Sequence, residues 1–68
     1  MYYIKIRNNV VCQPAYLCYD KTNKMYWWGM KENAVKFTET QIKPMINYVK
    51  HTYLASRATN GEINYEKV

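Results

Sequence analysis

An alternation of side chains near the N-terminus is the clearest pattern along the chain. Residues 2–7 put apolar side chains on one face and basic or aromatic ones on the other, namely Tyr2, Ile4 and Ile6 against Tyr3, Lys5 and Arg7. Because successive side chains of a strand point to opposite faces, this period of two predicts a half-buried strand. Its inner face would be apolar, and its outer face would be basic and aromatic.

Two further apolar runs, residues 15–20 and 25–28, flank a polar turn and predict a β-hairpin that ends at Gly29. Both faces of this hairpin would carry bulky side chains. Trp27 and Trp28 are adjacent, so they must point to opposite faces, and one ring remains outside. We assign Trp27 to the core and Trp28 to the outer face.

The helix that follows has two alternative starts. Residues 38–41 have the spacing of a capping box, but a helix capped by Thr38 would hold Pro44 beyond its first turn, where proline removes a hydrogen bond. A start near Lys43 would place Pro44 at the first helical position, which favours proline. We expect a two-step start and a main helix over residues 44–55. Its apolar stripe should pack on the sheet, and this stripe consists of Ile42, Met45, Ile46, Val49 and Tyr53.

The remaining segments complete an α+β fold. Residues 31–33 are expected to form a loop, residues 34–37 a short extended segment, and residues 62–67 a final strand with Ile63 and Tyr65 facing inward. The order β-β-β-(β)-α-β predicts one domain over residues 1–68, in which one helix packs on one face of a small antiparallel sheet of three to five strands. One helix covers one face, so the other face is the place to look for function.

Charge and composition favour a docking surface. The chain carries a net charge of +5 and has eight Tyr and two Trp among its 68 residues. This basic balance favours acidic partners, whether nucleic acid, anionic lipid or an acidic protein face. Without a long apolar run or a secretory signal, we expect a cytoplasmic protein that does not bind membranes. Cys12 and Cys18 are then expected as reduced thiols, and the alternative is a disulfide if the chain turns at Pro14.

Catalytic chemistry has little to build on. His51 is the single histidine, and the five Asp and Glu residues are scattered. Gly29 and Gly61 do not form a phosphate-binding loop, and the spacing of Cys12 and Cys18 matches no zinc motif. We therefore expect a protein that is not an enzyme and has no cofactor and no metal.

Basic and aromatic residues of the open face are the candidate partner-binding residues. Aromatic rings beside cations can stack bases and hold phosphates, and they suit a protein interface equally well. One such cluster consists of Tyr26, Trp27 and Trp28 next to Lys24. The alternative for the helix lysines is an ordinary solvated face. The candidates are Tyr3, Lys5, Arg7, Lys24, Trp28, Lys43, Lys50 and Arg57.

As a whole, the chain resembles small α+β proteins encoded by phages and prophages. The resemblance lies in the opening MYYIKI, the AVKF segment that leads into TETQI, and the closing INYEKV. It implies a non-enzymatic inhibitor or regulator of the anti-defence or anti-CRISPR type, which docks on a host protein or protein–nucleic acid complex in the host cytoplasm. The alternatives are direct binding of single- or double-stranded nucleic acid and a self-assembling structural subunit, including a homodimer.

Overall fold

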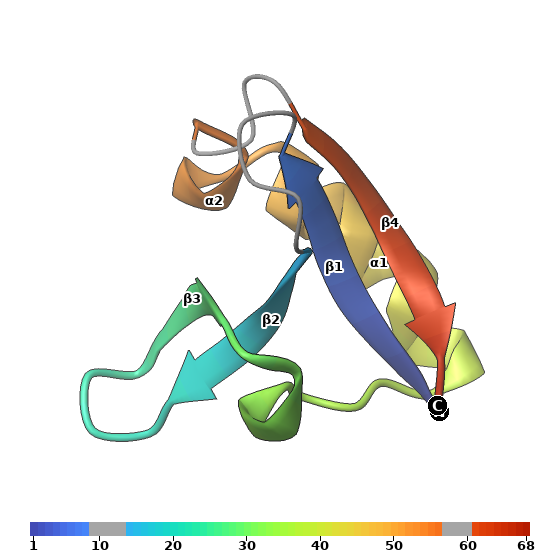
Figure 1. Ribbon diagram of the computed structural model, residues 1–68, viewed down its shortest axis with the longest axis horizontal. Helices are drawn as coiled ribbons and strands as arrows, with labels where there is room; N and C mark the ends of the chain where they lie inside the picture. The colour runs from blue at the N-terminus through green and yellow to red at the C-terminus, as the bar shows by residue number, and fades with distance from the viewer. Residues whose placement is uncertain (9–13, 57–60) are drawn as a thin grey trace.

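A computed structural model describes residues 1–8, 14–56 and 61–68 and shows an antiparallel sheet packed against a helix (Figure 1). The strand order is β3-β2-β1-β4. The strands are β1 (Tyr2–Asn8), β2 (Ala15–Asp20), β3 (Met25–Gly29) and β4 (Gly61–Lys67). The helices are η1 (Lys31–Asn33, a 3₁₀ turn), α1 (Glu39–Lys50) and α2 (Tyr53–Ser56). The predicted α+β class and element order are therefore confirmed.

The sheet opens into a V between its two central strands. β1 pairs with β2 at Lys5 and Ile6, and the two strands then diverge (Figure 1). The extended segment 34–37 bridges both arms, since Ala34 pairs with Cys18 of β2 and Phe37 with Tyr2 of β1. The Tyr2 and Phe37 backbones exchange hydrogen bonds of 2.7 and 2.8 Å. The extended conformation predicted for residues 34–37 is thus confirmed, and it satisfies backbone groups that the divergence would leave unpaired.

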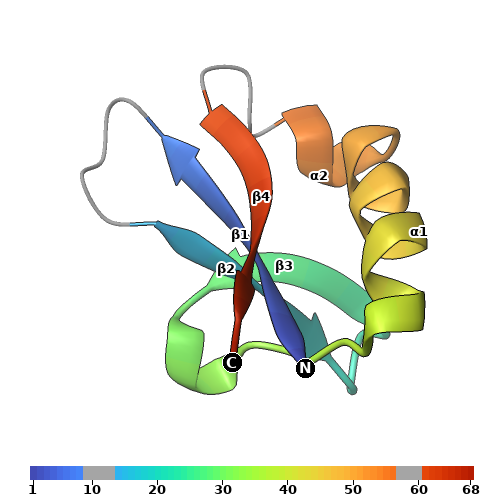
Figure 2. The ribbon, with the colours of Figure 1, turned by 90° about the vertical axis from the view of Figure 1, so that its right-hand side faces the viewer.

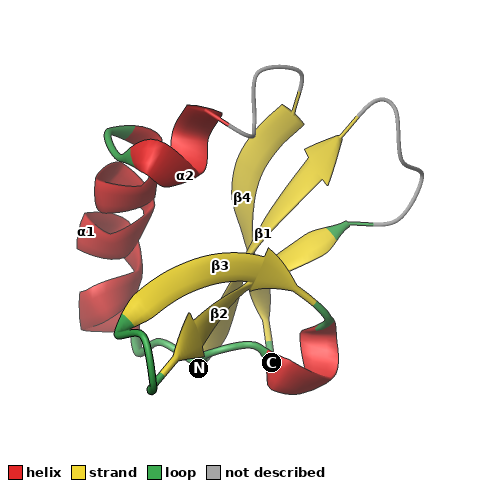
Figure 3. Ribbon diagram, turned by 90° about the vertical axis from the view of Figure 1, so that its left-hand side faces the viewer, coloured by secondary structure: helices red, strands yellow, loops and turns green. Residues whose placement is uncertain are grey.

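The core lies between the sheet and α1. Its buried residues come from β1, β2, the bridging segment and the two α-helices, and they are Ile4, Leu17, Phe37, Ile42, Val49 and Leu54. The alternation predicted for residues 2–7 holds, because Ile4 and Ile6 are buried while Arg7 is exposed. In β4, Ile63 packs against the core as predicted, but Tyr65 is 53% exposed, so its predicted inward burial was wrong. The short helix η1, predicted as a loop, lies on the side of the sheet away from α1 (Figures 2 and 3).

The start of the helix differs from the prediction. α1 begins at Glu39 and contains Pro44, so the expected main helix from residue 44 was wrong. The capping box decides the start, because the Thr38 N–H donates to Gln41 Oε1 at 3.1 Å. Burial of Ile42 in the first turn adds apolar stabilisation. Pro44 is exposed, so its ring sits on the solvent side and the helix loses one backbone bond.

The end of the helix also differs. α1 stops at Lys50, and α2 follows a break at residues 51–52. The Thr52 hydroxyl donates to the Val49 carbonyl at 3.3 Å, which satisfies a carbonyl at the helix end. The break changes the helical phase, so Leu54 is buried at 1% exposure and Tyr53 is 48% exposed. The prediction that Tyr53 belongs to the buried stripe was therefore wrong, and Leu54 occupies that place instead.

Candidate docking surface

Trp27 and Trp28 point to opposite faces of the sheet, as adjacent strand residues do, but each lies on the face that was predicted for the other. Trp28 pairs with Leu17 in register and packs against the core, and its indole Nε1 donates to the Leu54 carbonyl at 3.2 Å. Trp27 lies on the outer face and is 44% exposed. The placement of Trp28 on the outer face was wrong, because the buried Leu17 beside it sets which face of β3 is internal.

Trp27 is held in place by a glycine two residues further along β3. A Cβ added at Gly29 would lie 2.4 Å from Cζ3 of the Trp27 indole. The ring therefore lies across a backbone position that only glycine leaves clear. This contact keeps Trp27 against the sheet, so part of its surface is covered by its own strand.

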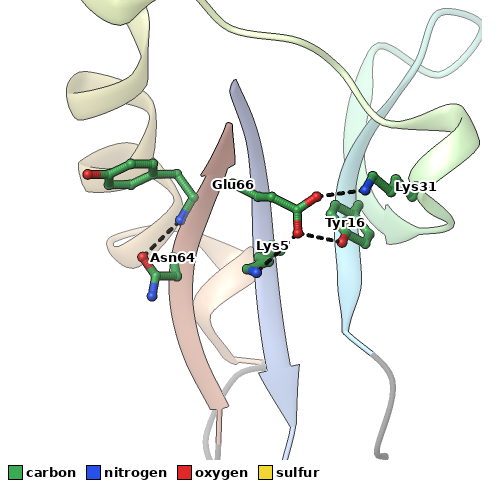
Figure 4. A network of polar contacts seen from close by, with 6 residues as sticks. Lys5, Tyr16, Lys31, Asn64 and Glu66 are labelled. Atoms are coloured by element: carbon green, nitrogen blue, oxygen red, sulfur yellow. Dashed lines mark hydrogen bonds and ion pairs between the residues drawn. The ribbon is translucent and has the colours of Figure 1, made fainter. Parts of the chain in front are cut away.

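The outer face of β1 carries Tyr3, Lys5 and Arg7, as predicted, but a carboxylate engages much of its charge. Glu66 of β4 accepts hydrogen bonds from Lys5 Nζ at 3.2 Å and from the Tyr16 hydroxyl at 3.1 Å, and Lys31 Nζ lies 2.8 Å from its other oxygen (Figure 4). We call Glu66, Lys5, Lys31 and Tyr16 the Glu66 network. It joins β4, β1, β2 and η1 across the sheet face that the sequence analysis predicted to be uncovered.

The electrostatics of the Glu66 network follow from these contacts. Hydrogen bonds from Lys31, and then from Lys5, lower the pKa of Glu66 to about 2. Burial, followed by the hydrogen bond to Glu66, raises the pKa of Tyr16. The Lys31 ammonium also lies 5.6 Å from the Tyr3 ring centroid and 5.7 Å from that of Tyr16. Two cations of the outer face are therefore already engaged within the protein.

A second surface gathers tyrosines around the β2–β3 hairpin and the helices. This groove has a volume of about 690 Å³, and we call it the tyrosine groove. Its principal lining residues are Tyr19, Tyr26, Tyr48, Tyr53, Lys21 and Lys24. The Tyr26 ring lies 4.9 Å from Tyr19 and 6.2 Å from Tyr48, measured between ring centroids. Burial, and then the neighbouring tyrosines, raise the pKa of Tyr26. Tyr26 is thus the half-buried centre of a ring cluster whose other members reach solvent.

Tyr53 also closes the backbone edge of β3, which is an outer strand of the described sheet. Its hydroxyl donates to the Tyr26 carbonyl at 2.9 Å and accepts from the Tyr26 N–H at 3.2 Å. One side chain therefore satisfies a donor and an acceptor that a further strand would otherwise pair. These two hydrogen bonds attach α2 to the edge strand beside the groove.

Of the remaining predicted residues, the three that the structure describes do not join the outer face. Lys24 lies in the β2–β3 turn with a left-handed φ of 53° and lines the tyrosine groove. Lys43 and Lys50 are exposed on α1 and do not line the groove. Arg57 lies outside the described residues. The structure thus distributes the described members of the predicted set over the outer sheet face, the hairpin turn, the helix and the core rather than over one surface.

Reactive groups within the described residues are dispersed. No three His, Cys, Asp or Glu side chains of residues 1–8, 14–56 and 61–68 gather in a cluster that could hold a metal ion. Cys18 is a buried free thiol, and burial raises its pKa. Cys12 lies outside the described residues, so the disulfide alternative does too. The His51 ring nitrogen Nδ1 contacts the Asn47 carbonyl of the preceding turn at 2.7 Å.

Comparisons with known proteins add no relative. No protein-family model matches the chain, and neither the curated proteins nor the solved structures contain a match. None of the helices in the described ranges is long and apolar enough to cross a membrane.

The sequence alone gave only part of the tyrosine groove. Lys24 was a candidate, and Tyr26 belonged with Trp27 and Trp28 to the predicted aromatic cluster beside it. Tyr19 stood in the predicted hairpin without a role, and Tyr48 was not singled out. A signal was present, because residues flanking a hairpin loop are paired across the strands, as Tyr19 and Tyr26 are. Nothing in the sequence indicated that Tyr48 of α1 would meet this pair.

Proposed function

We propose that this protein is a non-enzymatic docking protein that binds a partner protein through the tyrosine groove. The observation that carries the proposal is the ring cluster around Tyr26, in which Tyr19, Tyr48 and Tyr53 are each at least 40% exposed. Tyrosine supplies a large contact area with a polar tip, and it is enriched at protein interfaces and their hot spots.

The groove is a better docking surface than the outer sheet face. On the outer face, Lys5, Lys31 and Tyr16 are bound to Glu66, so a partner would have to compete with contacts inside the protein. In the groove, the exposed rings meet solvent. An inhibitor or regulator of the kind that the phage resemblance implies would act by occupying its target through these rings.

Affinity capture with matched variants tests the proposal. Tagged protein is incubated with lysate of the cell in which it acts, and the captured proteins are quantified for the native chain, for Tyr19→Ala/Tyr48→Ala, and for Tyr65→Ala. Tyr65 is also exposed but belongs to β4, at the other edge of the sheet, so it controls for the loss of a surface ring. We expect the groove variant to lose proteins that the Tyr65 variant retains. Equal recovery by both variants, with folding confirmed by circular dichroism, would contradict the proposal.

Direct nucleic-acid binding is a second candidate, and the presence of Lys21 and Lys24 beside tyrosine rings favours it. Rings and cations together form the usual single-strand binding surface. Binding of this kind weakens steeply with salt, because neutralised phosphates release counterions. A gel shift with single- and double-stranded oligonucleotides at low salt tests it, and the absence of any shift excludes it.

A further inference from the structure

We propose that the occupant of the tyrosine groove is an acidic segment of the partner protein, whose carboxylates pair with Lys21 and Lys24. This inference rests on the proposed docking function and adds the chemistry of the partner. Its first support is the charge of the groove, because the described residues that line it include two lysines and no Asp or Glu. A segment with Asp or Glu side chains would carry the complementary negative charge across the interface.

The two groove lysines differ from Lys5 and Lys31 of the outer face in having no carboxylate partner among the described residues. Lys5 and Lys31 each form an ion pair with Glu66. Within the ranges that the structure describes, neither Lys21 nor Lys24 forms an ion pair. Their charges therefore remain available to a ligand, next to rings that supply apolar contact.

The turn that carries these lysines is held by its own acidic residue. Asp20 Oδ1 accepts the Thr22 N–H at 2.9 Å, and Asp20 Oδ2 accepts from the Asn23 side-chain amide at 2.7 Å. These hydrogen bonds lower the pKa of Asp20 and commit its carboxylate to the turn. The turn is thereby ordered before a partner arrives, which reduces the entropy lost on binding.

The ring geometry favours a protein segment over a nucleic acid. Base stacking requires open ring faces. Tyr26 instead has neighbouring rings on two sides, inclined at 60° to Tyr19 and at 63° to Tyr48. The Tyr53 hydroxyl is bound to the Tyr26 backbone, which fixes that ring as well. The ring at the centre of the groove is therefore enclosed by its neighbours, which favours side-chain contacts at the groove over insertion of a base against Tyr26.

An NMR titration tests the inference. Isotope-labelled protein is titrated with a short peptide that alternates Glu with Leu, with the same peptide carrying Gln in place of Glu, and with an oligothymidylate of similar length. We expect the Glu peptide to shift the amide signals of Lys21, Lys24 and Tyr48 and to bind at least about tenfold more tightly than the Gln peptide, which is the effect of about 1.4 kcal/mol.

Charge-reversed variants locate the effect. Lys21→Glu/Lys24→Glu should weaken binding of the Glu peptide about tenfold or more. The control Lys43→Glu/Lys67→Glu changes the net charge equally, but its sites are exposed and lie outside the groove lining, so it should bind nearly as the native chain does. Equal weakening in both variants, absence of peptide binding, or binding of the oligonucleotide alone would overturn the inference. The docking proposal would still stand if Tyr19→Ala/Tyr48→Ala lost its captured partner, so the two failures are distinguishable.

Discussion

The indole Nε1 of Trp28 donates a hydrogen bond to the backbone carbonyl of Leu54 at 3.2 Å and thereby ties the edge strand β3 to α2. Replacing Trp28 by Phe keeps a ring in the core but leaves this carbonyl without its donor. We expect Trp28→Phe to lower the free energy of unfolding by about 1–3 kcal/mol. Trp27→Phe, on the exposed face of the same strand, should change it by about 0.5 kcal/mol or less. Urea denaturation followed by circular dichroism measures both, and equal losses would show that the two rings are not divided between core and surface.

The hydroxyl of Tyr53 provides a second test of how α2 covers the sheet edge. Tyr53→Phe removes the acceptor of the Tyr26 N–H and the donor to its carbonyl. We expect faster hydrogen–deuterium exchange at the Tyr26 amide and a loss of about 0.5–1.5 kcal/mol in stability. Tyr65→Phe serves as the control. Unchanged exchange at Tyr26 would mean that the hydroxyl does not protect this edge.

The Glu66 network makes the free energy of unfolding depend on pH in the acid range. The pKa of Glu66 is about 2 in the folded protein, against an ordinary 4.5. Between these values the unfolded chain takes up a proton that the folded chain does not, so stability present above pH 4.5 is lost as the pH falls towards 2. We expect Glu66→Gln to be less stable than the native chain at pH 7 and the difference to shrink through this window.

Thermal unfolding at a series of pH values measures this dependence. Glu32→Gln is the control, because Glu32 is exposed on η1 and forms no ion pair with another described residue. It should follow the native profile. A constant difference between Glu66→Gln and the native chain from pH 7 to pH 2 would show that the ion pairs of Glu66 do not stabilise the fold.

Local patterns predicted most of the fold, because strands and caps depend on neighbouring residues. The alternation over residues 2–7 and the apolar run at 15–20 correspond closely to β1 and β2, and the Thr38–Gln41 spacing formed its capping box. The helix start was predicted wrongly because the choice between Glu39 and Pro44 depended on how strongly the capping box and the burial of Ile42 stabilise the first turn. The choice between Trp27 and Trp28 depended on which face of β3 meets α2, which is a tertiary contact.

The candidate site was harder to predict for the same reason. Lys5 and Glu66 are 61 positions apart, and strand pairing alone brings them together. Because Glu66 engages Lys5 and Lys31, part of the positive charge that the composition indicated for the outer face is paired within the protein. The tyrosine groove forms only where α1 meets the β2–β3 hairpin, which is a tertiary contact. The composition therefore indicated an excess of tyrosine but not its location.

Photo-crosslinking from inside the groove tests the central claim most directly. A benzophenone amino acid is placed at Tyr48 or, as a control, at Tyr65, and the protein is irradiated in the cell in which it acts. We predict a discrete covalent adduct with a partner protein from position 48 and none from position 65. An adduct from position 65 alone, or no adduct from position 48, would contradict docking through the tyrosine groove.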